Sequence, residues 1–272
     1  MLGDLVKRCV RLSFRILLSL TAAYLLLAYI LIPIFLRHYE HRPELEKFSK
    51  TSFTRDGLPG DPLNVGLLCL EKELLEAMKA AGWRVSDPLK ISSDFKIAED
   101  VLLRKSYLQA PVSRLYLFNR PQDYAFEKEV GGSPARRHHV RFWRTGIVGK
   151  EGGPFWIGSA TYDRSVGVSH YTAQLTHHID ADIDKERDTL FSNLAQAGQL
   201  LKIYQVSGVG PSLNEYNGGG DRYFTDGELT AGVITHENAV SLEEPKKLPN
   251  PVLVEAKNSF WNLMRNAMNV LD

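Results

Sequence analysis

The chain has 272 residues, of which 44% are hydrophobic and 24% are charged, as is usual for a folded protein with a sizeable core. Its formal net charge is +1, but the first 37 residues hold five of the basic residues and only one acidic residue. The remainder therefore carries 28 Lys and Arg against 31 Asp and Glu. This net acidic remainder argues against nucleic acid as a partner.

The N-terminal region contains a long apolar stretch at residues 16–36, with the sequence ILLSLTAAYLLLAYILIPIFL. As a helix, its 21 uncharged residues are enough to cross about 30 Å of hydrocarbon. The apolar core of a cleaved signal peptide is shorter, about 7 to 15 residues. We therefore expect one uncleaved signal anchor in a single-pass membrane protein.

Basic residues stand on both sides of this stretch: Lys7, Arg8, Arg11 and Arg15 before it, and Arg37, Arg42, Lys47 and Lys50 after it. The count is nearly balanced, but the N-terminal charges lie closer to the span. We expect residues 1–15 in the cytoplasm and the soluble domain on the non-cytoplasmic side. Cys9 and Cys69 then lie on opposite sides of the membrane and cannot form a disulfide.

The rest of the chain divides into a linker at residues 37–60, a domain at 61–240, and a second linker with an amphipathic helix at 241–272. Apolar residues at helical spacing predict helices at 71–83, 92–105 and 182–198. A period of two predicts strands at 62–69, 115–120, 124–130, 138–144, 154–164, 169–178, 199–206 and 228–236. Because the connections are short, we predict an α+β domain with a mainly antiparallel sheet and three to four packed helices.

The C-terminal helix, predicted at 251–271, places Phe260, Leu263, Ala267, Met268 and Leu271 on one face. We expect this face to dock on the domain. Lying on a membrane surface is the alternative, but Lys257 and Arg265 are the only basic residues on its polar side.

A hairpin is predicted around Gly131, Gly132 and Pro134. A register symmetric about Pro134 places Glu129 opposite His139 and Glu127 opposite Arg141. Two interpretations stay open: a structural charge ladder across the strands, or a site that uses His138 or His139.

A second predicted hairpin places Asp163 opposite His170, on a face shared with Thr172, Gln174, Thr176 and His178. His177 falls on the other, apolar face and is expected in the core. The polar face is either the solvated side of the sheet or a site in which Asp163, His170 and His178 are catalytic. His170, His178 and Asp180 also form a mixed nitrogen and oxygen set that suits a divalent metal ion, namely zinc, manganese or iron.

The segment THHIDADIDKERD, residues 176–188, leads into a predicted helix. Its alternating aspartates resemble the start of a calcium loop, but Lys185 stands where that loop needs Gly and Phe191 where it needs Glu. We expect Asp180 or Asp182 to cap the helix instead.

Anion-binding residues are predicted from the arginines around these acids. Arg137, Arg141 and Arg187, together with His139, are candidates to hold a phosphorylated ligand, although arginines on sheets more often pair with carboxylates. The loop NGGGD, residues 217–221, offers backbone N–H groups, but an ordinary hairpin loop is the simpler interpretation.

Several blocks in order, DPLNVGLL, APVSRLYLFNRPQDYAFEKEVGGSPARRHHVRFWR, SATYDRSVGVSH, THHIDADIDKERD and GGGDRYFTDG, resemble the LssY-like C-terminal domain family between about residues 61 and 236. The resemblance implies membrane-lipid or bacterial envelope chemistry, since the domain often accompanies multi-pass modules of the DedA or lipid-phosphatase type. Lipid-phosphatase activity itself is not implied, because the signature of that module is missing here.

Two function classes follow. The first is an enzyme, as a candidate metal-dependent hydrolase, or a binding protein that acts on a phosphorylated or lipid-headgroup ligand. The second is a non-catalytic module that docks on membrane or envelope proteins. The expected partners are the bilayer and, in either case, lipid headgroups or other membrane proteins. The first class predicts that His170→Ala or His178→Ala abolishes activity or binding without unfolding the domain.

Overall fold

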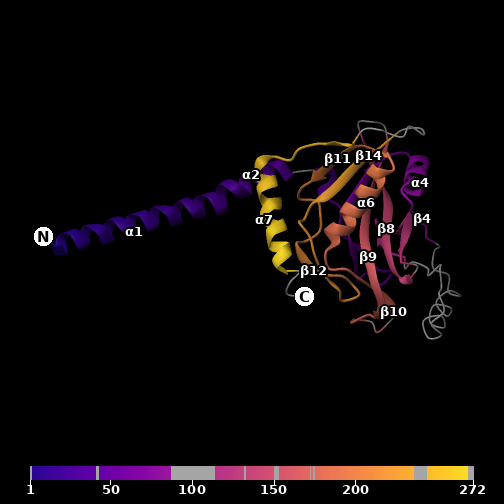
Figure 1. Cartoon of the computed structure of the whole chain (residues 1–272), viewed down its shortest axis with the longest axis horizontal. Helices are drawn as coiled ribbons and strands as arrows, with labels where there is room; N and C mark the ends of the chain where they lie inside the picture. Colours follow the sequence, from indigo (N-terminus) through magenta and orange to yellow (C-terminus); the bar gives the residue numbers. More distant parts are fainter. Residues whose placement is uncertain are drawn as a thin grey trace. The chain divides into compact units, whose positions relative to one another are not determined.

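The computed structural model describes residues 2–40, 43–86, 114–131, 133–149, 153–171, 173, 175–235 and 244–268 (Figure 1). The chain forms two units, residues 1–41 and 42–272. The helix predicted at 92–105 lies outside the described residues.

The first unit is one apolar helical run made of α1 (Leu2–Leu26), a π-helical turn (Leu27–Leu31) and α2 (Ile32–Glu40). The π-helical turn ends two residues before Pro33, whose ring nitrogen has no hydrogen to donate to the preceding turn. Residues Val6–Phe35 are long and apolar enough to cross a membrane. The unit therefore fits a membrane anchor, as expected.

The second unit begins earlier than predicted. The short helix α3 (Pro43–Glu46) and the strands β1 (Thr51–Phe53) and β2 (Pro59–Pro62) lie largely in the expected linker. β1 and β2 form a small sheet with β5 (Tyr116–Leu117) and β6 (Arg120–Pro121), in the order β2-β1-β5-β6. Leu45 and Phe48 pack against a buried core, which ties this part of the linker to the domain.

The main sheet has nine described strands. They are β3 (Val65–Leu68), β4 (Arg84–Val85), β7 (Tyr124–Val130), β8 (Ser133–Val148), β9 (Pro154–Val168), β10 (Leu175–Ile179), β11 (Leu200–Val206), β14 (Leu229–Ile234) and β15 (Lys246–Lys247). Their order is β15-β11-β14-β3-β9-β8-β7-β4, with β10 also paired to β9. β3–β14 and β11–β15 are parallel and the other pairs antiparallel, which confirms the predicted fold class. β12 (Asn214–Tyr216) and β13 (Arg222–Phe224) form a separate hairpin.

Two hydrophobic cores lie on opposite faces of this sheet. Helices α4 (Glu71–Ala80) and α6 (Ile183–Gln196) cover one face, where Leu74, Met78 and Leu190 pack with Phe142 and Trp156 (Figure 1). The other face carries a core that includes Leu63, Leu117, Trp143, Ile157 and Leu229. Because side chains alternate along a strand, residues neighbouring in sequence on β8 and β9 belong to different layers.

Glycines end both of the covering helices. Gly82 follows α4 with φ +80° and Gly198 follows α6 with φ +66°, a left-handed conformation that other residues adopt only with strain. The C-terminal helix α7 covers Val252–Met268, inside the predicted range of 251–271.

The register of both predicted hairpins was wrong. In the first, Glu127 pairs with His139 and Glu129 with Arg137, because Val130 already pairs with Ser133 and the turn precedes Pro134. The charge ladder therefore exists, displaced by two residues.

In the second hairpin, β9 continues to Val168 instead of turning at residues 165–168. Ile179 therefore pairs with Asp163, and His178 pairs with Ser165. His170 lies beyond the end of β9 and cannot stand opposite Asp163 in the ladder.

Candidate functional site

The site forms on one face of three adjacent strands. On β8, Arg137, His139 and Arg141 alternate and so point to the same side. On β9, their direct partners are Asp163, Thr161 and Ser159, respectively. The face is not solvated: Arg137 and His139 are each 2% exposed and Arg141 is 5% exposed. For the β9 part of the polar face predicted in the second hairpin, the solvated interpretation is wrong, because Asp163, Thr161 and Ser159 are 3%, 1% and 0% exposed.

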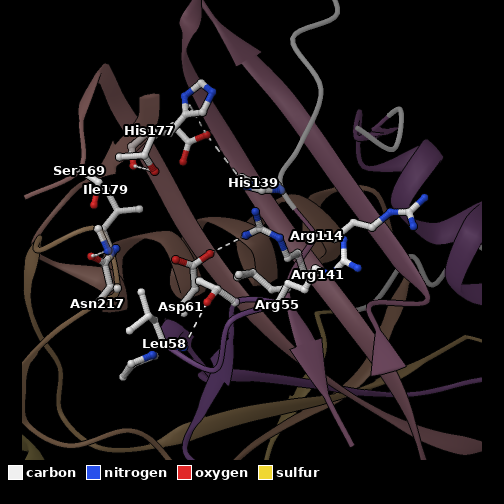
Figure 2. A pocket seen from close by; sticks show the side chains of 18 of the residues that line it. Arg55, Leu58, Asp61, Arg114, His139, Arg141, Ser169, His177, Ile179 and Asn217 are labelled. Carbon is white, nitrogen blue, oxygen red and sulfur yellow. Dashed lines mark hydrogen bonds and ion pairs between the residues drawn. The ribbon is translucent and has the colours of Figure 1, made fainter. Parts of the chain in front are cut away.

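A pocket of about 280 Å³ opens over this face (Figure 2). Its walls come from the segment that joins β1 to β2, from β8, β9 and β10, and from the loop between β12 and β13. Four arginines line it, Arg55, Arg114, Arg137 and Arg141, against three aspartates, Asp56, Asp61 and Asp163. Arg55 and Arg114 are exposed, whereas Arg137 and Arg141 are buried.

Arg137 connects the strands at the inner end of the pocket. Its Nε donates to Asp163 Oδ2 at 3.0 Å and its Nη1 donates to Glu127 Oε2 at 2.8 Å. Its Nη2 lies 3.1 Å from His177 Nε2. A guanidinium can only donate hydrogen bonds, so His177 Nε2 accepts this one and the ring hydrogen is on Nδ1.

The Nδ1 atom of His177 faces a carboxylate, because it lies 3.5 Å from Asp163 Oδ2. Burial lowers the pKa of His177, while Asp163 acts in the opposite direction. His177 is therefore a neutral imidazole with one nitrogen toward an acid and a lone pair toward Arg137. A carboxylate beside Nδ1 is one part of a general-base arrangement, but the lone pair on Nε2 is occupied by Arg137 Nη2.

His139 is the second imidazole at the pocket. Burial holds its pKa well below the ordinary value, and Arg141 and Arg137 lower it further. Its Nδ1 lies 3.9 Å from Asp163 Oδ2, and its buried Nε2 has no hydrogen-bond partner among the described residues. A buried polar atom without a partner costs about 1 to 3 kcal/mol, so this nitrogen is a natural contact for a ligand.

Asp61 completes the inner pocket from β2 and pairs with Arg141 Nη1 (Figure 2). Burial raises the pKa of Asp61 and lowers that of Arg141, and each partner opposes the shift of the other. Burial likewise raises the pKa of Glu127, against the effect of Arg137. Asp61, Asp163 and Glu127 thus neutralise the two inner arginines, and at the mouth the exposed Arg55 and Arg114 stand against the exposed Asp56.

The structure brings together four of the residues singled out from the sequence: Asp163, Arg137, Arg141 and His139. It does not bring Arg187 to them. Arg187 is a buried residue of α6, where it donates to Asp226 at 2.8 and 3.0 Å and to Asp184 at 3.2 Å. These carboxylates raise its pKa despite burial, and the expectation that Arg187 holds an anion in this site is wrong.

The predicted pair His170 and His178 lies outside the residues that line the pocket. His178 Nδ1 is 2.7 Å from Asp221 Oδ1, and the rings of His170 and His178 are 5.9 Å apart. Asp180 accepts a hydrogen bond from the backbone of Asp182 at the start of α6. Asp182 is the residue before the helix, as predicted, but its side chain makes no capping hydrogen bond.

No group of three or more His, Cys, Asp or Glu side chains in the described part of the chain is arranged to hold a metal ion. The loop at residues 217–221 is an ordinary hairpin loop between β12 and β13, as in the simpler interpretation. The Asn217 side chain accepts the N–H groups of Gly219 and Asp221, both at 2.9 Å, so these donors are already used within the loop.

Residues missed from the sequence are His177, Asp61 and Glu127. His177 was assigned to the apolar face because it alternates with Ala173 and Leu175, yet it also alternates with Ile179, which pairs with Asp163. Its alternation with Ile179 was readable, but its partner was not. Asp61 comes from a distant strand, and no local pattern marks it.

The fold and pocket define a mainly antiparallel α+β domain with a buried Arg, His and Asp site, preceded by an apolar helix that fits a membrane anchor. Residues 43–229 match the family described as LssY C-terminus, and the chain belongs to this family. The match begins before residue 61, in agreement with the early start of the folded unit. Neither a curated protein nor a solved structure matches the chain.

Proposed function

We propose that the pocket binds a phosphorylated ligand, with Arg137 and Arg141 at the anion and the His177–Asp163 pair placed to move a proton. The observation that carries this is the convergence of two buried arginines and two neutral histidines on one pocket of about 280 Å³. Arginine suits phosphate because its planar fork matches two oxygens at once.

A purely structural charge network is the competing explanation. Buried ion pairs contribute little net stability compared with apolar residues of similar size, so stability alone does not account for this cluster. A structural network also has no need of a cavity beside it or of an unpartnered nitrogen on His139.

Hydrolysis is the reaction that this geometry favours. A water that attacks phosphorus must lose a proton, and His177 Nε2 can accept it once Arg137 Nη2, which donates to that nitrogen in the structure, turns to the phosphate. The imidazolium that forms then lies beside Asp163, which stabilises its charge. As the P–O bond breaks, the leaving oxygen keeps the bonding electron pair and takes a proton from solvent, the imidazolium returns its proton to solvent, and phosphate stays with Arg137 and Arg141 until it is released.

The ligand is either a lipid headgroup or a soluble phosphate ester, and the anchor favours the first. The melting temperature of the full-length protein in vesicles tests binding, with inorganic phosphate and glycerol phosphate as soluble probes and chloride at equal ionic strength as the control. At a ligand concentration of ten times Kd, binding adds about 1.4 kcal/mol to the free energy of unfolding. The melting temperature then rises by roughly 2 to 5 °C. Vesicles with and without phosphatidic acid form the lipid arm.

Neighbouring histidines of β8 supply a matched pair of variants. His139→Gln removes an imidazole from the pocket, whereas His138→Gln changes the other face of the strand, where His138 contacts Glu186. We expect His139→Gln to weaken phosphate binding about tenfold, since a hydrogen bond to a charged group is worth about 1.5 to 3 kcal/mol. Equal phosphate responses in the two variants would contradict the proposal.

The proposed topology places the N-terminus in the cytoplasm and the pocket on the other side. Cys9 is exposed and Cys69 is buried, so a membrane-impermeant thiol reagent reports on Cys9 alone. Intact cells should protect Cys9, and permeabilised cells should label it. Labelling in intact cells would reverse the orientation.

A non-catalytic interaction module is the second candidate, because an exposed apolar strip on α7 is a feature of docking surfaces. On that hypothesis, phosphate leaves the melting temperature unchanged and changes in the pocket have no effect on partner binding.

A further inference from the structure

The helix α7 carries an apolar strip that the described part of the domain does not cover. Val252 is 83% exposed, Phe260 64% and Leu263 69%, and Leu253 and Met264 are also exposed. At helical spacing these residues fall on one side, beside a polar edge that includes Glu255 and Asn262. Large apolar side chains grouped in this way mark an interaction surface.

The opposite side of α7 is fixed to the domain. Val254 is fully buried, and Lys257 Nζ donates to the buried carboxylate of Glu228. Asn258 Nδ2 donates to Gln205 Oε1 at 3.1 Å. These contacts determine which side faces out, so the expectation that the apolar face docks on the domain is wrong for Phe260 and Leu263.

We infer that this strip lies in the interfacial layer of the bilayer in which the N-terminal helix is anchored. The apolar helix ends at Phe35 and the first strand begins at Thr51, with fifteen residues between them. Even fully extended, they span at most about 50 Å. The linker therefore keeps the domain within this distance of the bilayer, so the bilayer is an apolar partner that is always available to the strip.

The chemistry of α7 suits this partner. Helices that lie in the interface insert Phe and Leu to a depth of roughly 5 to 10 Å and keep their polar edge in water. The exposed Lys246 and Lys247 of β15, which precede α7 in the chain, carry the charge that anionic headgroups attract. This inference depends on the anchor and not on the pocket. A test that disproves the proposed ligand therefore leaves it unaffected.

A fluorescent probe on full-length protein in vesicles tests the inference. The background is Cys9→Ser, in which the remaining Cys69 is buried and does not react. Leu263→Cys places the probe on the apolar strip, and Asn262→Cys, the preceding residue, places it on the polar edge as the matched control. Both positions are exposed, so the melting temperatures of the unlabelled variants should equal that of the Cys9→Ser parent.

Vesicles of phosphatidylcholine and phosphatidylglycerol that contain acyl-chain nitroxide lipid give the readout. We expect blue-shifted emission and loss of most of the intensity at position 263, with little change at 262. Equal, water-like emission from both probes would overturn the inference. A second outcome would also overturn it: blue-shifted emission at position 263 that appears only at a high protein-to-lipid ratio and is not quenched by nitroxide lipid. That outcome assigns the strip to contact with a second copy of the chain.

Discussion

The Nδ1 atom of His177 lies 3.5 Å from Asp163 Oδ2, and the Nε2 atom of the same ring accepts a hydrogen bond from Arg137. One imidazole thus joins the carboxylate of β9 to the guanidinium of β8. Because Arg137 can only donate, the geometry also fixes the tautomer of His177.

His177 and His178 are adjacent but have opposite expected roles. We predict that His177→Gln abolishes turnover of a phosphate ester and weakens the phosphate-induced rise in melting temperature. His178→Gln should keep both, because His178 pairs with Asp221 outside the pocket lining. Phosphate titrations of the two variants make the comparison. Loss of function in His178→Gln alone would restore the interpretation drawn from the sequence.

The exposed arginines at the mouth of the pocket should guide the anion inward. Changing Arg55 and Arg114 together to Ser should weaken phosphate binding about threefold to tenfold at low salt and flatten its salt dependence. The melting temperature without ligand should not change. The matched control is Arg222→Ser on β13, outside the pocket lining, which should leave binding as it was.

Arg187 should matter for stability alone. Arg187→Met leaves Asp184 and Asp226 buried without their shared cation, at a cost of about 3 to 5 kcal/mol in the free energy of unfolding. Urea unfolding measures this, with the exposed Lys185→Met on the same helix as control. A variant as stable as the parent that has lost phosphate binding would instead place Arg187 in the site.

Gly167 tests the register of β9 and β10. A Cβ atom there would lie 2.4 Å from His178 Nε2, while the Nδ1 of that ring is held by Asp221. Gly167→Ala should therefore cost about 1 to 3 kcal/mol, by displacing a ring that is already packed. If residues 165–168 formed a turn instead, an exposed alanine would be tolerated, and unchanged stability in thermal unfolding would argue for that register.

Glu186 should make stability depend on pH. Burial raises its pKa from 4.5 to about 7, while its hydrogen bond to His138 opposes the shift. Between these values the folded protein keeps a proton that the unfolded chain has lost, so its contribution to stability falls as pH rises through this window. Compared with Glu186→Gln, the parent should lose up to roughly 3 kcal/mol of its free energy of unfolding as pH rises through this window. Parallel pH dependences of the two proteins would show that the carboxyl titrates normally.

Much of the architecture was readable from local patterns. The apolar run, the strands with a period of two and the helices around Leu74 and Leu190 were predicted correctly, since burial of one face imposes those periods. The alternation of Arg137, His139 and Arg141 on one strand face was equally local.

Strand register, burial and the partner of each side chain were decided by the tertiary structure. The register shift between His178 and Ile179 in the β9–β10 pair placed His177, and not His178, beside Asp163, because a shift of one residue reverses the face of a strand. The segment at residues 54–61 packs over the polar face and places Asp61 beside Arg141. This contact joins residues 80 positions apart in the sequence. The docking of α7 through Lys257 likewise left its apolar strip outside. Sequence periodicity says which residues share a face, but only long-range packing says what that face meets.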